Sequence, residues 1–124
     1  MGMSDYRDLE AWRAAHELAL AVFKYTQTWP RSERYGLVAQ VRRAVFSVPV
    51  NLVEGSRRRG VREFRRFVDF SLGSLGEVRY TLEFAAAAGI ATQGDIKALA
   101  PLVERVGRLC FGLARSLDRA ARPS

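Results

Sequence analysis

The sequence predicts an all-α protein that folds as an antiparallel up-down-up-down four-helix bundle. Apolar residues recur at alternating spacings of three and four along four stretches of the chain, as expected for helices that each bury one face. The sequence has no strand pattern, and prolines and glycines punctuate the short segments between the four stretches. Four helices with short connections pack as an up-down bundle. We therefore expect one domain over residues 1–124, with helices at about 8–29, 33–54, 61–88 and 93–119.

The first helix, 8–29, carries two parallel apolar stripes, one through His16 to Phe23 and one ending at Trp29. Pro30 should end this helix, because the residue before a proline is disfavoured in the α region. Two stripes make an apolar face broader than one neighbouring helix would cover. Surplus apolar surface of this kind indicates binding partners.

The second helix, 33–54, is expected to begin near Ser32, whose hydroxyl can cap the first turn. Pro49 lies deep within the apolar pattern of this helix. Because Leu52 continues the pattern, the proline predicts a kink rather than an end. Gly55 is the expected terminator, and a turn follows it.

The third helix, 61–88, also has two apolar stripes. Gly73, Ser74 and Gly76 are poor helix formers and predict the close approach of another backbone. Gly89 is a signal for the C-terminal end of the helix. The second stripe contains Phe70, Gly73, Glu77, Tyr80 and Phe84.

The fourth helix, 93–119, opens with Thr92 and Asp95 at the spacing of a capping box. Pro101 predicts either a kink or a later start of this helix. Cys110 lies on the apolar face, and we interpret it as a buried small hydrophobe rather than as a reactive thiol.

Composition indicates a soluble cytoplasmic domain. A single cysteine excludes an intrachain disulfide and fits a reducing compartment. No apolar run approaches the roughly 18 residues needed to cross a membrane, and the first residues lack the apolar region of a signal peptide. We expect no membrane association and no cofactor.

Positive charge is concentrated in one segment of the chain. Eight arginines and two glutamates fall between Arg42 and Arg66, so this segment carries +6 of the net charge of +7. An arginine-rich composition can reflect the genome, but clustering creates a local field that attracts phosphates or acidic partner surfaces.

We predict a nucleic-acid contact at the turn between the second and third helices. Arginine forks suit phosphates, and the N-terminus of the third helix adds partial positive charge. Contacts of this type give affinity without sequence information. The alternative is a basic surface that only increases solubility. The candidate residues are Arg57, Arg58, Arg59, Arg62, Arg65 and Arg66.

A polar stripe accompanies the apolar face of the second helix. At 100° per residue, its members fall within about 80° of one another. We interpret the stripe as a partly buried hydrogen-bond network at a subunit interface, in which Arg43 and Glu54 neutralise each other directly or through Asn51. Glu77 of the third helix is a candidate member, and the alternative is an ordinary solvated face. The stripe consists of Gln40, Arg43, Ser47, Asn51 and Glu54.

The sequence does not favour an enzyme or a metalloprotein. His16 is the only histidine and lies on an apolar stripe, so we interpret it as a core or interface residue. Metal sites in helical bundles need glutamate and histidine on facing helices, and one histidine cannot supply two such pairs. A nuclease built on carboxylates alone is conceivable, but neighbouring arginines explain these acids more simply as ion-pair partners. The acids are Glu54, Glu63, Asp69 and Glu77.

The chain resembles a known family in several motifs. The run QVRRAVFSVPVNLVEGSRRR is followed by EFRRFVDFSLGSLGEV, and the opening LEAWRAAHELALAVFKYTQTWP matches as well. These segments are similar to the four-helix bundle proteins encoded within intervening sequences of bacterial large-subunit ribosomal RNA genes. The resemblance implies a four-helix bundle assembled as a ring-like homopentamer without catalytic activity. A related group of small basic bundle proteins serves the reverse transcriptases of diversity-generating retroelements, where a pentameric ring binds nucleic acid and the polymerase.

Two functions are therefore open. The first is a non-catalytic homo-oligomer, a pentamer by resemblance, that binds RNA or DNA phosphates nonspecifically. The second is a scaffold or accessory protein whose ring surface engages another protein, such as a reverse transcriptase. The chain departs from the family at Gly60, where a serine or threonine cap of the third helix is expected and glycine makes a weaker cap.

Overall fold

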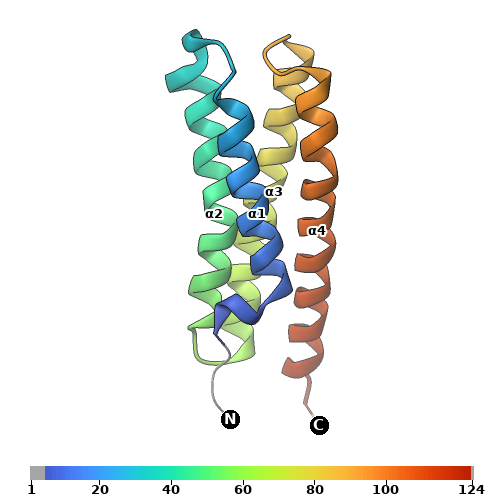
Figure 1. Ribbon diagram of the computed structural model, residues 1–124. Helices are drawn as coiled ribbons and strands as arrows, with labels where there is room; N and C mark the ends of the chain where they lie inside the picture. Colours follow the sequence, from blue (N-terminus) through green and yellow to red (C-terminus); the bar gives the residue numbers. More distant parts are fainter. Residues whose placement is uncertain (1–4, 124) are drawn as a thin grey trace.

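The computed structural model describes residues 5–123. Within that range the chain is mostly helical and contains no strand, and four long helices form an antiparallel up-down-up-down bundle (Figure 1). The predicted fold class is confirmed. No helix in the described range is both long and apolar enough to cross a membrane. The long helices are α1 (Glu10–Thr26), α2 (Ala39–Ser56), α3 (Val61–Ala87) and α4 (Gln93–Ala121).

The two ends of the bundle differ in what they contain. A short 3₁₀ turn, η1 (Tyr6–Asp8), precedes α1. Figure 1 shows η1, the α2–α3 turn and the end of α4 at one end of the bundle, and the α1–α2 and α3–α4 connections at the other. The arginine-rich turn and the α1–α2 connection are therefore separated by the length of the helices.

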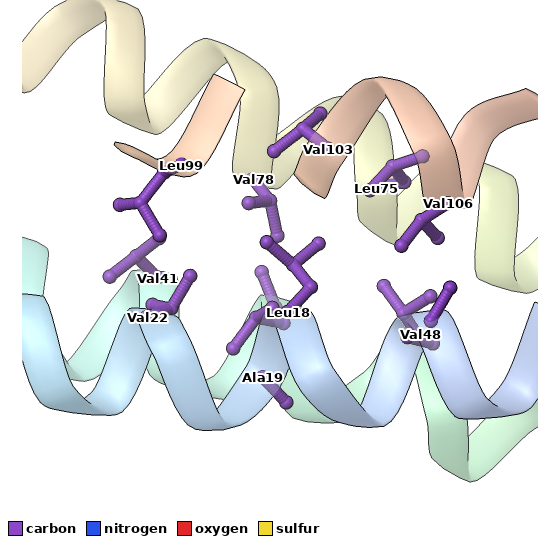
Figure 2. Close-up of a cluster of buried hydrophobic side chains, with 14 of the residues drawn as sticks. Leu18, Ala19, Val22, Val41, Val48, Leu75, Val78, Leu99, Val103 and Val106 are labelled. Carbon is purple, nitrogen blue, oxygen red and sulfur yellow. The ribbon is translucent and has the colours of Figure 1, made fainter. Parts of the chain in front are cut away.

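The core is built from one aliphatic stripe on each helix, and Figure 2 shows part of it. Removing this apolar surface from water is the main stabilising contribution, at about 25 cal/mol per Å². Alanines such as Ala15 and Ala85 are fully buried among the larger side chains. The largest fully buried aliphatic residues are Leu18, Val22, Val41, Val45, Val48, Leu52, Val68, Leu75, Val78, Leu99 and Val106.

The first helix ends earlier than predicted, at Thr26. The Thr26 hydroxyl donates to the Val22 carbonyl at 2.7 Å, and the Trp29 amide donates to the Thr26 carbonyl at 3.2 Å. Leaving the helix lets Trp29 fold back into the core, where 6% of it is exposed. Pro30 therefore follows the end of α1 and does not define it.

The second helix begins later than predicted, at Ala39. Two irregular turns precede it, a 3₁₀ turn η2 (Arg31–Glu33) and a π-helical turn η3 (Arg34–Val38). Ser32 lies in η2 and does not cap α2; the Glu33 carboxylate instead accepts the Leu37 amide at the long distance of 3.5 Å. Gly36 has φ −102° and ψ −108°, outside the helical region, and this geometry delays regular helix.

Helix α2 continues past Pro49 to Ser56, so the proline does not end the helix, as predicted; the kink stays a prediction. Two carbonyls next to the proline accept side-chain donors. Ser71 Oγ donates to the Val48 carbonyl at 2.8 Å, and Asn51 Nδ2 donates to the Ser47 carbonyl at 2.9 Å. The carbonyl that Pro49 leaves without a helical donor is that of Val45, four residues earlier, so these two bonds are additional contacts close to the proline.

Local signals at the α3–α4 connection are confirmed. Gly89 has φ +76° directly after the end of α3, a conformation that favours glycine. Thr92 and Asp95 form a reciprocal capping box, with amide-to-side-chain distances of 3.0 and 3.2 Å. Because the helix begins immediately after Thr92 and continues through Pro101, the alternative of a later start is wrong.

The second apolar stripe of α3 lies outside the core. Tyr80 is 65% exposed, Phe84 47% and Phe70 43%. Gly73 and Gly76 have no atom within 4 Å of the place that a Cβ would occupy, so the predicted backbone approach does not occur within this chain. The surplus apolar surface expected from the sequence is present on α3. On α1, by contrast, most of the stripe that ends at Trp29 is buried.

Candidate nucleic-acid interface

The arginine-rich turn is a short, closely defined connection between α2 and α3. Ser56 Oγ donates to the Val53 carbonyl at 2.8 Å at the end of α2. Gly60 has φ +83°, a conformation that strains other residues, and α3 begins at Val61 directly after it. Glycine is a weaker helix cap than serine or threonine, but the positive φ at position 60 makes it the residue that this turn requires.

Gly55 brings the two helices together just before the turn. It was predicted as the terminator of the helix, but it is buried inside α2. A Cβ at this position would stand 2.8 Å from Phe67 Cβ and 2.9 Å from Phe64 Cδ1. The two helices can approach this closely because glycine has no side chain.

Arg65 is the member of the predicted set that faces the protein. It pairs with Asp69 one turn along α3, and its Nε donates to Asp118 of α4 at 3.0 Å. The hydrogen bond to Asp69 raises the pKa of Arg65, and the bond to Asp118 adds to the rise. Its side chain is 30% exposed. This guanidinium ties α3 to α4, and we exclude it from the candidate interface.

Arg58 and Arg66 lie over aromatic rings near the surface. Arg58 pairs with Glu54 at 3.2 Å, and its guanidinium sits 4.8 Å from the centre of the Phe67 ring. Arg66 pairs with Glu63 at 3.2 Å and sits 5.2 Å from the Phe70 ring. Exposed pairs of this kind contribute about 0–1 kcal/mol. A phosphate can therefore displace either carboxylate at little cost.

Three arginines at or next to the turn are free of ion pairs within residues 5–123: Arg57, Arg59 and, in the first turn of α3, Arg62. All three side chains are exposed. A backbone hydrogen bond from Arg7 lowers the pKa of Asp5, and the charge of Arg57 contributes less. The segment η1 and the turn lie at the same end of the bundle (Figure 1). Full guanidinium forks are available to an anionic ligand at this end of the bundle.

The last two turns of α4 contribute arginines that the sequence analysis did not include. Arg115 and Arg119 are exposed on α4, and Arg122 follows its end. The end of α4 and the α2–α3 turn lie at the same end of the bundle (Figure 1). The up-down topology was sufficient to predict this proximity, because it places the second turn and the fourth helix terminus together.

The polar stripe divides into two small groups of contacts. Gln40 Nε2 donates to the Glu77 carboxylate at 3.4 Å, so Glu77 does join from α3. Asn51 Nδ2 donates to Ser47 Oγ at 3.0 Å, and Ser47 Oγ lies 2.7 Å from Ser74 Oγ of α3. The half-buried centre of the stripe is therefore a hydroxyl and amide contact between α2 and α3.

The predicted pairing of Arg43 with Glu54 is wrong. Glu54 pairs with Arg58, and Asn51 bonds only towards Ser47. Both Arg43 and Glu54 are exposed. At 1.5 Å per residue, eleven residues place them about 16 Å apart along α2, too far for direct contact.

The acidic residues considered for catalysis lie beside arginines or polar groups. Glu54, Glu63 and Asp69 each pair with an arginine, as the ion-pair interpretation predicted. No group of three or more potential metal ligands occurs within residues 5–123. The prediction for His16 is corrected in part, because the side chain is exposed and stacks on Trp12 with ring centres 4.9 Å apart.

Cys110 is buried, as predicted, and burial raises the pKa of its thiol to about 11. We expect this thiol to react with a disulfide reagent at pH 8 at least about a hundredfold more slowly than a free cysteine, because two pKa units reduce the thiolate fraction by that factor. Measurement of the labelling rate checks this. Unfolding in denaturant should restore the normal rate, and rapid labelling of the native protein would contradict the burial.

The protein is therefore an antiparallel four-helix bundle with exposed arginines gathered at one end. The comparison with protein families identifies the group: the model of the 23S rRNA-intervening sequence protein family matches residues 7–121. The chain belongs to this family. The comparison with curated proteins gives no match.

Proposed function

We propose that the protein is a cytoplasmic, non-catalytic homo-oligomer that binds RNA or DNA phosphates through the α2–α3 turn. The observation that carries the proposal is the set of exposed arginines Arg57, Arg59 and Arg62, which lack ion-pair partners in residues 5–123. Arg58 and Arg66 flank this set with weakly held carboxylates. Like charges gathered at one end of a bundle repel one another, and a polyanion relieves that repulsion.

Replacing Arg57, Arg59 and Arg62 with glutamine should weaken nucleic-acid binding and reduce its salt dependence. For duplex DNA, log affinity falls with log salt at a slope of about 0.9 per phosphate contact. The triple variant should therefore lose up to about 2.7 from that slope, and about tenfold or more in affinity at low salt. Fluorescence anisotropy with labelled RNA and DNA at several salt concentrations measures both quantities.

The control is a charge-matched triple variant with glutamine at Lys24, Lys97 and Arg108. These exposed cations lie away from the turn, on α1 and α4. If net charge alone drives binding, both variants will lose the same slope. Equal losses, or no binding of RNA or DNA by the unaltered protein at low salt, would defeat the proposal.

The oligomer is supported by the exposed aromatic stripe on α3. Phe70, Tyr80 and Phe84 are all exposed on this face, and nothing in residues 5–123 covers it. Large exposed apolar patches mark interaction sites. The family resemblance points to a ring of five subunits.

Light scattering on a size-exclusion peak should give about 70 kDa, five times the chain mass of 13.9 kDa. Replacing Tyr80 and Phe84 with glutamate should dissociate the assembly, because it would bury two charges without partners. Tyr35→Glu is the control, since Tyr35 is an aromatic residue on the α1–α2 connection and is 88% exposed. A 14 kDa species from the unaltered protein would rule out the oligomer.

A second function, as a scaffold or accessory protein, is favoured by apolar side chains elsewhere. Leu20, Phe46 and Phe111 are each more than half exposed and lie on three different helices. If the chain assembles through the α3 stripe alone, these three side chains remain exposed and can contact another protein, such as a reverse transcriptase. Phe111→Glu should then abolish capture of that protein and leave the salt slope for nucleic acid unchanged.

A further inference from the structure

A pocket of about 360 Å³ is lined by residues from the end of α1 through the α1–α2 connection to the start of α2. The α1–α2 connection lies at the end of the bundle opposite the arginine-rich turn (Figure 1). Its volume is within the range of small-ligand sites. Arg31, Arg34 and Arg42 line it, together with Trp29, and no aspartate or glutamate does. Three arginines in the lining of one pocket, without an acid beside them, favour an anionic occupant.

Arg42 is held in place before any ligand arrives. Its Nε donates to Thr26 Oγ1 at 3.0 Å, and its Nη2 donates to the Phe23 carbonyl at 3.1 Å. The guanidinium carbon also lies 4.8 Å from the centre of the Phe23 ring. Its Nη1 has no hydrogen-bond partner in residues 5–123. A fixed arginine with an unused terminal group loses little freedom when it binds an anion.

Arg31 and Arg34 complete the cationic wall from the two irregular turns. Both are exposed and have no ion-pair partner within the described chain. The only acid between them in sequence, Glu33, is directed to the Leu37 amide. The 3₁₀ and π-helical turns η2 and η3 therefore contribute two unpaired arginines to the lining of the pocket.

Trp29 also lines the pocket, and it is 6% exposed. Its indole Nε1 is the one buried side-chain polar atom without a hydrogen-bond partner within residues 5–123, although buried donors are rarely left unpaired. Because Nε1 is itself buried, the pocket's attraction for an anion comes from the three arginines, and the indole beside them can report a bound ligand through its fluorescence.

We propose that this pocket binds a phosphate monoester. Such a group carries nearly two negative charges at neutral pH and several strong acceptor oxygens, which match several arginine forks better than one carboxylate does. The group has two possible sources, a free mononucleotide or the 5′-terminal phosphate of a nucleic-acid strand. The site is separate from the α2–α3 turn, so the binding function proposed for the turn can fail without affecting this site.

The test follows AMP binding through Trp29 fluorescence in a Trp12→Phe variant, in which Trp29 is the only tryptophan. AMP should give a saturable change, and adenosine should give none. Replacing Arg31 and Arg34 with glutamine should weaken AMP binding about tenfold or more, since charge-assisted hydrogen bonds are lost. Lys24→Gln is the control, because Lys24 lies in the last turn of α1 and does not line the pocket.

Two further measurements separate the sources. Oligonucleotides with a 5′-phosphate or a 5′-hydroxyl are compared in a chain that also carries Arg57→Gln, Arg59→Gln and Arg62→Gln. Tighter binding of the 5′-phosphorylated strand assigns the site to strand ends, and binding of AMP without that preference assigns it to free nucleotides. Either result supports the proposal.

The AMP titration is repeated by calorimetry on the unaltered chain. This second measurement detects binding even if the fluorescence of Trp29 does not change when AMP binds. The proposal is overturned by no heat of binding at millimolar AMP, by equal affinities of the arginine and lysine variants, or by equal binding of adenosine. An acidic peptide that binds there more tightly than AMP would overturn it in favour of a protein partner.

Discussion

Truncating Leu18 to alanine should lower the free energy of unfolding by about 2–5 kcal/mol, the range for a large core residue reduced to alanine. Leu18 is fully buried, and Figure 2 shows it near the centre of the cluster. The loss combines the apolar surface no longer removed from water with the cavity left behind. Denaturant unfolding followed by circular dichroism measures it. The protein concentration is held fixed, because the stability of the proposed oligomer would depend on it.

Leu20→Ala provides the matched control on the same helix. It removes the same atoms two residues further along α1, where the side chain is 60% exposed. A surface change of this kind should alter the free energy of unfolding by no more than about 0.5 kcal/mol. Equal destabilisation by the two variants would show that α1 does not pack with the face seen in this structure.

The parts of the fold that the sequence predicted are those that depend on neighbouring residues. The Thr92 and Asp95 capping box needs only a three-residue spacing, and its two hydrogen bonds form as expected. The α1–α2 connection depends on distant packing instead. Trp29 leaves the helix to reach a core that other helices complete, and no local pattern around Pro30 or Ser32 encodes that destination.

The candidate interface shows the same division between local and distant information. The arginine cluster was visible in sequence because it is contiguous. The pairing of Arg65 with Asp118 was not visible in the sequence, because the two residues are 53 positions apart. Helix geometry alone excludes a direct pair between Arg43 and Glu54, because a rise of 1.5 Å per residue separates them by about three helical turns.

Gly55→Ala should destabilise the protein by about 1–3 kcal/mol, because the added methyl group overfills a closed contact. The new Cβ would stand 2.8 Å from Phe67 Cβ, an atom attached directly to the α3 backbone. A flexible side-chain end could move aside, but this atom moves only if the helices separate. The gain in helix propensity, up to about 1 kcal/mol, offsets part of the loss.

Gly112→Ala distinguishes close packing from helix propensity. Gly112 lies inside α4, away from the aromatic stripe of α3, and has no atom within 4 Å of its would-be Cβ. The same chemical change should therefore stabilise the chain by about 0.5–1 kcal/mol. Opposite signs for the two variants in denaturant unfolding would establish that Gly55 is required for approach. If both stabilise, the α2–α3 contact is looser than the structure shows, and the turn that carries Arg57 is free to move with it.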